Sequence, residues 1–205
     1  IIIAADDDRI LAAAKTFGAH GVKTRSDHES GTDRIAEVAA LCKWQAGEIV
    51  VNLQGDEPLM PPALVRQMAD VLAQHPEAAL ATASTQIHAA ADVVNPNIVK
   101  VVTDASGMAL YFSRAPLPYD RAGNVDVSRF QYQRHIGLYA YRVSTLNALT
   151  KMPPAPLEQL EQLEQLRALH AGMGIFVTRI EEAPPHGVDA PEDLAAVREL
   201  LGHVA

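Results

Sequence analysis

The sequence predicts an α/β fold in which a mainly parallel, Rossmann-like sheet carries an antiparallel insertion. Two observations support this class. Through residue 84, short apolar runs alternate with amphipathic stretches in the order strand, loop, helix, which is typical of a parallel sheet covered by helices on both faces. From Ile98 the spacing changes to short apolar runs separated by a turn, which indicates hairpin pairing.

The first half of the chain contains the elements expected of the parallel part. The expected strands are residues 1–5, 22–24, 48–53 and 79–84, and the expected helices end near Thr16, Leu41 and His75. We expect Asp6 to cap the first helix and Gly18 to end it. Pro61 and Pro62 suit the first positions of the third helix, because proline needs no backbone N–H there.

The second half contains the insertion and a return to helices. Residues 98–103 and 108–112 form an expected hairpin that turns at 104–107, followed by a proline-containing loop, 114–129, and a strand, 135–142. Two helices, a strand at 175–180 and a helix at 191–201 complete a single domain, residues 1–205. The loop around Pro116 and Tyr119 and the apolar strand Ile136–Tyr141 offer more apolar surface than one core needs, so 98–142 is also an expected dimer contact.

The repeated LEQ segment from Leu157 to Gln165 raises the alternative of a coiled coil. Its leucines recur every third residue, so they drift about 60° per step around a helix of 3.6 residues per turn. A coiled coil needs a mean spacing near 3.5. We therefore expect a single helix that is buried on several sides and that turns its glutamates and glutamines to a polar cavity or to solvent.

Composition excludes several classes of protein. The 205 residues are 48% hydrophobic and 20% charged, which is typical of a globular chain with a sizeable core. The net charge of −8, without a basic cluster, argues against a nucleic-acid-binding face. No apolar run approaches the roughly 18 residues of a membrane helix, and no basic leader precedes an apolar stretch. Cys42 is the only cysteine, so we expect a cytoplasmic protein without an intrachain disulfide.

A carboxylate follows each of two expected strands. Asp56 lies just past residues 48–53, where Gly55 permits a close turn, and ligands of open parallel sheets bind beyond the carboxyl ends of the strands. Asp189 lies between the strand 175–180 and the helix that begins at Pro191. Magnesium is usually held by one or two carboxylates and substrate phosphates. A plain turn at Asp56 and a helix N-cap at Asp189 are the alternatives.

Other polar residues are less specific. The arginines that could bind an anion are Arg34, Arg114, Arg134 and Arg167. Arg34 opens a helix after a Ser-Gly-Thr-Asp loop, where backbone N–H groups can face an anion. His135 precedes an apolar strand, where a lone histidine is more often structural than catalytic.

Seven segments, in order along essentially the whole chain, closely resemble the 3-deoxy-manno-octulosonate cytidylyltransferase family. They are SDHESGTDRIAEVA, VNLQGDEPLMPP, NPNIVKVV, YFSRAPLPYDR, RHIGLYAYR, PLEQLEQLEQLRAL and GVDAPEDLAAVREL. The resemblance implies the fold of nucleotide-diphospho-sugar transferases. It also implies a Mg²⁺-dependent homodimer that transfers CMP from CTP to 3-deoxy-D-manno-octulosonate (Kdo), for lipopolysaccharide synthesis in Gram-negative bacteria.

The same resemblance implies roles for individual residues. Asp56 and Asp189 match the two magnesium carboxylates, and Arg34 matches an arginine near nucleotide and sugar. The positions that match the acidic-sugar pocket are Gln54, Arg114, His135, Glu161, Glu164 and Gln165. Because Glu161 and Gln165 are four residues apart, we expect them to share a helix face.

One departure from the family concerns the region before Ile1. The family begins with a strand and a basic, glycine-containing loop that holds the CTP triphosphate, and no segment here matches it. We therefore expect this chain to fold at least partly and not to turn over CTP without that loop. A sialic-acid-activating cytidylyltransferase and a catalytically inactive, dimerising chain are the alternative functions.

Overall fold

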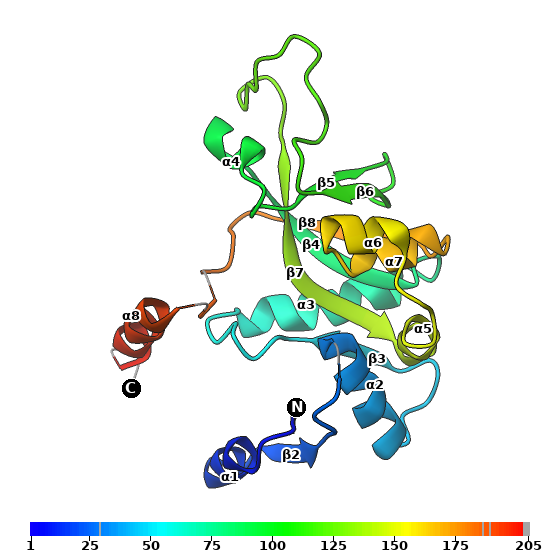
Figure 1. Ribbon diagram of the computed structural model, residues 1–205, viewed down its shortest axis with the longest axis vertical. Coiled ribbons are helices and arrows are strands. Elements are labelled where there is room, and N and C mark those ends of the chain that lie inside the picture. Colours follow the sequence, from blue (N-terminus) through cyan, green and yellow to red (C-terminus); the bar gives the residue numbers. More distant parts are fainter. Residues whose placement is uncertain (29, 186, 189, 203–205) are drawn as a thin grey trace.

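The structure, a computed structural model, describes residues 1–28, 30–185, 187–188 and 190–202 (Figure 1). Its strands are β1 (Ile2–Ala5), β2 (His20–Lys23), β3 (Ile49–Asn52), β4 (Leu80–Gln86), β5 (Lys100–Thr103), β6 (Ala109–Ser113), β7 (Gln133–Arg142) and β8 (Ile175–Ile180). Its helices are α1 (Asp8–Thr16), α2 (Gly31–Leu41), α3 (Pro62–Gln74), α4 (Ala90–Val94), α5 (Val143–Leu149), α6 (Pro156–Glu161), α7 (Gln165–His170) and α8 (Pro191–Gly202).

The larger sheet is built around β7. Strand β4 pairs with β7 along most of its length, whereas β5 pairs with its first residues and β3 with its last, from Tyr139 to Arg142. Strand β8 adds to β4 in parallel, and β6 adds to β5 as a hairpin. Strands β3, β4, β5 and β8 thus run in one direction and β6 and β7 in the other. The predicted mixed α/β class with a mostly unidirectional sheet is confirmed.

Strands β1 and β2 form a separate, parallel two-stranded sheet connected by α1. Figure 1 shows this unit beside α2, away from the larger sheet. The predicted helix cap is shifted by one residue: Asp7, not Asp6, accepts a hydrogen bond from the backbone N–H of Arg9 at 2.7 Å. The chain therefore continues one residue further beyond β1 before α1 begins.

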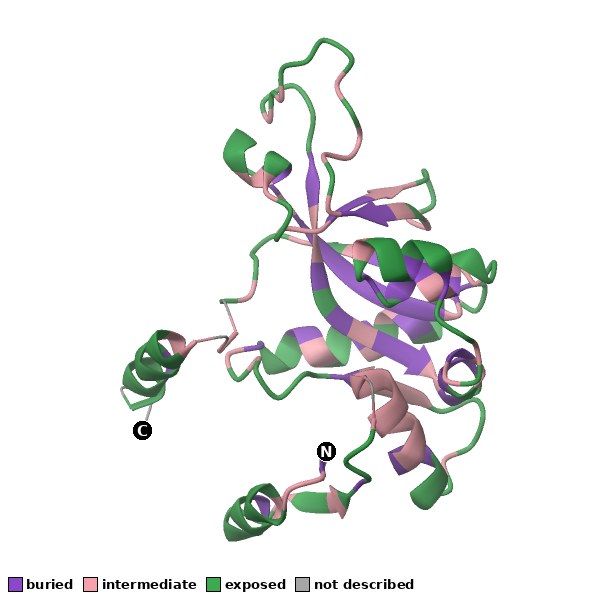
Figure 2. Ribbon diagram, viewed as in Figure 1, coloured by how far each residue is buried: buried purple, intermediate pink, exposed green. Residues whose placement is uncertain are grey.

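Two apolar clusters cover the two faces of the larger sheet (Figure 2). On one face, Leu64, Met68 and Leu72 of α3 pack against alternate residues of β7. On the other face, α5 and α7 contribute Leu146 and Leu166, both fully buried. The core thus lies in two layers on either side of the sheet, as the alternating pattern of the sequence predicts.

Strand β7 is a central strand, and this corrects one expectation. Ile136 and Leu138 are only 6% and 1% exposed, because α3 packs on their face of the sheet and β7 has β4 on one side and β3 and β5 on the other. They therefore cannot supply the surplus apolar surface expected of residues 136–141. Exposed apolar side chains of the insertion lie instead at Leu110, Tyr119 and Phe130.

The LEQ segment is not one helix. Helix α6 ends at Glu161, Gln162 adopts a left-handed conformation with φ 51°, and α7 begins at Gln165. The expectation of a helix buried on several sides is wrong, since Leu160 is 81% exposed while Leu166 is fully buried. Glu161 and Gln165 therefore do not share a helix face. Between β7 and β8 the chain forms three helices, not two.

Candidate functional site

A cavity of about 220 Å³ opens at the carboxyl end of β3. Its walls come from the end of β3 and the following loop, the start of α2, one face of β7 and the α6–α7 break. The polar lining residues are Ser30, Thr32, Asn52, Gln54, His135, Tyr139, Tyr141, Gln162, Glu164, Gln165 and Arg167. This position agrees with the expectation that ligands bind beyond the carboxyl ends of the strands.

One face of β7 forms the floor of the cavity. His135, Gly137, Tyr139 and Tyr141 all line it, because side chains two residues apart point to the same side of a strand. The intervening residues, such as Leu138, belong to the apolar cluster under α3. One strand thus carries a polar aromatic face and an apolar face.

The start of α2 forms one wall. Ser30 caps the helix: its hydroxyl accepts a hydrogen bond from the Asp33 N–H at 3.2 Å and donates one to the Asp33 carboxylate at 2.9 Å. Gln54 packs directly on Gly31, where a Cβ atom would lie 2.8 Å from the Gln54 amide nitrogen. The Gln54 side chain, from the loop after β3, would therefore have to move if residue 31 carried a Cβ atom.

The α6–α7 break forms the opposite wall. The Glu164 carboxylate accepts a hydrogen bond from the Thr32 hydroxyl at 3.1 Å, which closes the cavity between α7 and α2. Burial raises the pKa of Glu164, and the carboxylates of Asp33 and Glu158 act in the same direction, against the opposing effects of Thr32 and Arg167. Among the described lining residues, Arg167 is the only arginine or lysine.

Two buried polar atoms of the cavity have no hydrogen-bond partner in the described part of the chain. They are the hydroxyl oxygen of Tyr139 and the amide nitrogen of Gln165. Gln165 is only 7% exposed. A buried donor without a partner costs about 1–3 kcal/mol, so native proteins keep few of them. Both groups belong to residues that line the cavity, and each has a donor that is not used within the described part of the chain.

His135 is neutral at physiological pH. Burial, together with the nearby charge of Arg134, lowers the pKa of His135 from 6.5 to about 3. Its Nε2 atom lies 3.0 Å from the Thr82 hydroxyl, which also lies 3.0 Å from the carbonyl oxygens of Ile136 and Leu138. Because Thr82 has one proton and two carbonyl acceptors, we assign the neutral His135 proton to Nε2, where it donates to Thr82. Nδ1 is then the acceptor.

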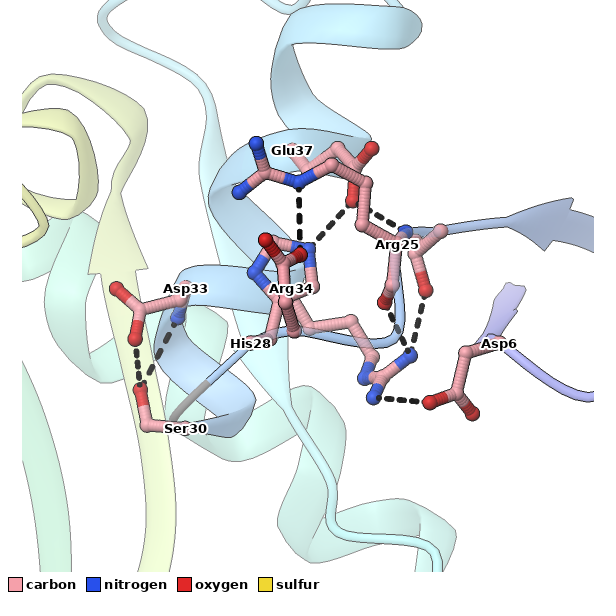
Figure 3. Close-up of polar contacts among 9 residues, drawn as sticks. Asp6, Arg25, His28, Ser30, Asp33, Arg34 and Glu37 are labelled. Atoms are coloured by element: carbon pink, nitrogen blue, oxygen red, sulfur yellow. Dashed lines mark hydrogen bonds and ion pairs between the residues drawn. The ribbon is translucent and has the colours of Figure 1, made fainter.

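Arg34 does not line the cavity. Its guanidinium donates to the Thr24 hydroxyl at 2.6 Å and forms an ion pair with Asp6 at 3.3 Å (Figure 3). Because Asp6 follows β1 and Thr24 follows β2, Arg34 links the ends of both strands to α2. One turn along the same helix, Glu37 accepts from the Arg25 N–H at 3.0 Å and contacts His28 at 2.5 Å. Arg34 and Glu37 thus bind residues in the segment 24–28, ahead of α2.

Arg114 and Glu161 lie beside the cavity and bond to each other rather than lining it. The Glu161 carboxylate accepts from the Ser113 hydroxyl at 2.7 Å and from the Arg114 N–H at 2.8 Å. The Arg114 guanidinium donates to the Glu161 carbonyl at 2.7 Å. The ammonium group of Lys100, which is fully buried, donates to the Arg114 carbonyl oxygen. This junction fixes the end of α6 on β6.

Asp56 is exposed on the loop after β3. The backbone of the segment before α8 packs on this loop: the Val188 N–H donates to the Asp56 carbonyl at 2.7 Å. A Cβ atom at Gly187 would lie 2.7 Å from the same carbonyl and 3.2 Å from the Glu57 carboxylate. Asp189, the second predicted magnesium ligand, lies outside the described residues.

The loop after β3 offers carboxylate oxygens, the kind of donor that holds magnesium. Among the described residues, no cluster of three or more histidine, cysteine or acidic side chains could hold a metal. Magnesium does not need one, since one or two carboxylates together with phosphate oxygens and water suffice. The exposed Asp56 carboxylate and the adjacent Glu57 lie on a loop that the 187–188 backbone contacts closely. The Asp56 carboxylate is thus chemically suited to a magnesium ion that is also bound by phosphate oxygens.

Of the predicted site residues, the structure brings Gln54, His135, Glu164 and Gln165 together at the cavity. Sequence reasoning assigned no role to Thr32, Tyr139 or Tyr141, and left Arg167 among the unassigned arginines. The alternation of polar and apolar residues in RHIGLYAYR was the signal that could have identified the two tyrosines, since it places them on the face of His135. Thr32 lies in the SDHESGTDRIAEVA segment, two residues before Arg34, but its contact with Glu164 depends on the packing of α2.

The chain is similar to known proteins along most of its length. The family model described as cytidylyltransferase matches residues 1–175. The chain is 53% identical to a 3-deoxy-manno-octulosonate cytidylyltransferase of Pseudomonas syringae pv. syringae (strain B728a), over 98% of this chain and 81% of that protein. It is 51% identical to the enzyme of the same name from Thioalkalivibrio sulfidiphilus (strain HL-EbGR7), over 98% of this chain and 82% of that one.

A solved structure is also similar over the full chain. It is that of a CMP:2-keto-3-deoxy-manno-octonic acid synthetase in complex with CTP. The TM-score is 0.89 and the sequences are 40% identical, with 100% of this chain and 81% of the other covered.

Proposed function

The chain belongs to the cytidylyltransferase family, and on that premise we propose that it transfers CMP from CTP to Kdo, giving CMP-Kdo and pyrophosphate. The observation that carries this proposal is the likeness, along the whole chain, to a synthetase that binds CTP. The cavity beyond β3 supports it. Its unpartnered Tyr139 hydroxyl and Gln165 amide suit a ligand rich in hydroxyl groups.

In this proposal the sugar acid occupies the cavity on β7. The Gln54 and Gln165 amides, the Tyr139 hydroxyl and the Glu164 carboxylate bind and orient it. The C2 hydroxyl of Kdo attacks the α-phosphorus of CTP as the bond to pyrophosphate breaks, and its proton is released. Catalysis then depends on holding both substrates in line, because phosphoryl transfer leaves little covalent chemistry to the protein.

We also propose a magnesium ion, held by Asp56 and Asp189 together with CTP. When bound, this ion neutralises charge on the phosphate oxygens. The exposed Asp56 carboxylate beside the 187–188 backbone supports the first ligand. Asp189 rests on the family resemblance alone.

Pyrophosphate release by the full-length protein tests the function. We expect release with CTP, Kdo and Mg²⁺ together, and none when Kdo is replaced by sialic acid or when EDTA is added. Release with sialic acid in place of Kdo would identify the alternative cytidylyltransferase. Failure to release pyrophosphate with either sugar would contradict the proposed reaction.

A homodimer is a further part of the proposal. Leu110 on the edge strand β6 and Tyr119 and Phe130 in the loop before β7 are 61%, 78% and 47% exposed, and they offer apolar surface for a partner. Light scattering of the purified protein should give twice the monomer mass, and Tyr119→Asp should shift it toward the monomer. A monomer at micromolar concentration would contradict this assignment.

The product would serve lipopolysaccharide synthesis in the cytoplasm. In the part of the chain that the structure describes, no helix combines the length and the apolar character needed to cross a bilayer. Loss of lipopolysaccharide in cells depleted of the protein would test the role, and fractionation would test the location.

A further inference from the structure

Arg167 and Glu158 form an ion pair across the α6–α7 break. The Arg167 Nε donates to Glu158 Oε2 at 2.8 Å and Nη2 donates to Oε1 at 2.5 Å, so the contact is bidentate. The two side chains are 20% and 9% exposed. The residues between them include the left-handed Gln162 and the turn that leads to Glu164 and Gln165.

The same pair reaches two further backbone segments. Glu158 Oε2 accepts from the Ala155 N–H at 2.9 Å, at the start of α6. Arg167 Nη1 lies 3.4 Å from the carbonyl of Leu149, at the end of α5. The ion pair therefore links the start of α6, the end of α5 and the middle of α7. These contacts lie both before and after the α6–α7 break in the chain.

The position of the pair connects it to the cavity. Arg167 and Glu164 both line the cavity on β7 and an adjoining one of about 270 Å³, which Glu158 also lines. Gln165, whose amide nitrogen has no partner in the described residues, lies two positions from Arg167 at the start of α7. A rotation of α7 would thus move Arg167, Glu164 and Gln165 together.

Stability alone does not account for a charged pair at this place. Replacing a buried ion pair by apolar residues of similar volume is often neutral or stabilising, because desolvation offsets the attraction between the charges. A bidentate guanidinium–carboxylate contact, in contrast, fixes the relative orientation of the two helices.

We propose that Arg167, through Glu158, is a positioning residue for the sugar-acid substrate: it holds the α6–α7 break in the conformation that turns Glu164 and Gln165 into the cavity. This inference rests on the proposed function. It assigns to Arg167 an effect on the sugar acid and not on CTP.

Steady-state kinetics with Kdo and CTP varied separately test it. In Arg167→Met, we expect the KM for Kdo to rise roughly tenfold, about the effect of losing one or two hydrogen bonds to the sugar, while the KM for CTP changes less than about twofold. Arg167→Lys keeps the charge but cannot form the bidentate contact, so its KM for Kdo should also rise.

Two more variants separate positioning from stability. The double variant Glu158→Leu/Arg167→Met removes both charges, so its Tm should recover toward wild type while its KM for Kdo stays raised. Arg142→Met is the matched control: this guanidinium also donates to backbone carbonyls, those of Leu72 and His75, but does not line the cavity. It should lower Tm and leave both KM values unchanged.

The outcomes are distinguishable. An unchanged KM for Kdo, or KM values for Kdo and CTP that rise together, would overturn the positioning role while wild-type turnover still supports the proposed function. If neither the single variants nor the double variant folds, the pair has a purely structural role, and this result would also contradict the positioning role. Absence of wild-type turnover would contradict the proposed function itself.

Discussion

Tyr139→Phe should make the protein more stable and its sugar binding weaker. The substitution removes only the hydroxyl, which is buried and has no partner among the described residues. Burial also raises the pKa of this phenol well above its usual value, so the hydroxyl keeps its proton and is a donor at all working pH values. The ring contacts, with centroids 5.3 Å from His135 and 5.8 Å from Tyr141, remain.

The size of each effect follows from the cost of an unpaired buried donor. Removing the Tyr139 hydroxyl should raise the free energy of unfolding by about 1 kcal/mol, which for a chain of this size corresponds to a rise of about 2–4 °C in Tm. The same hydroxyl would donate one hydrogen bond to bound Kdo. Its loss should weaken Kdo binding by about 2- to 10-fold.

Thermal unfolding without substrates and calorimetric titration with Kdo measure the two effects. Tyr141→Phe is the matched control, because Tyr141 lies two residues further on the same face of β7 but has Thr32 as a hydrogen-bond partner. It should lower Tm where Tyr139→Phe raises it. A fall in Tm for Tyr139→Phe comparable to that of Tyr141→Phe would refute the reasoning, since it would show that the Tyr139 hydroxyl has a partner in the free protein.

Three further predictions concern the metal ligand, the buried histidine and the buried lysine. Asp56→Asn should abolish pyrophosphate release and change the free energy of unfolding by less than about 0.5 kcal/mol, because the side chain is exposed; full activity would remove Asp56 from the metal site. His135 binds a proton only near pH 3 in the folded state but near 6.5 when unfolded, so stability that is complete above pH 6.5 should fall as pH decreases toward 3. The slope from this group is at most about 1.4 kcal/mol per pH unit, and urea unfolding between pH 5 and 7 should show a smaller slope in His135→Gln. Lys100→Met should lower the free energy of unfolding by about 3 kcal/mol or more, since Lys100 donates to the carbonyls of Asn95, Ile98 and Arg114; a change below 1 kcal/mol in chemical denaturation would contradict this.

The sequence by itself determined the order and type of most elements. The strand expected at residues 175–180 is β8, and the helix expected to start at Pro61–Pro62 is α3, because β-branched runs and helix-starting prolines act locally. The hairpin at 104–107 follows from Gly107, whose φ of +91° other residues rarely adopt. These features depend on residues close together in the chain.

Family resemblance indicated four of the residues that line the cavity. It indicated Gln54, His135, Glu164 and Gln165, which the fold brings to one cavity, and also Arg34, Arg114 and Glu161, which the fold uses to join segments around it. A motif indicates that a residue belongs to the region of a site. It does not indicate whether the side chain points to the ligand or to the backbone beside it.

Only the tertiary structure decided the position of β7 and the break in the LEQ segment. Local pattern cannot show that β7 lies with β4 on one side and β3 and β5 on the other, because strand neighbours depend on pairing between residues far apart in the chain. Propensity favours one helix from Leu157 to Gln165, yet Gln162 is left-handed, and the Glu158–Arg167 pair and the burial of Leu166 stabilise the separated helices. Contacts between distant segments there outweigh helix propensities of less than about 1 kcal/mol per residue, and they turn Glu164 and Gln165 toward the cavity.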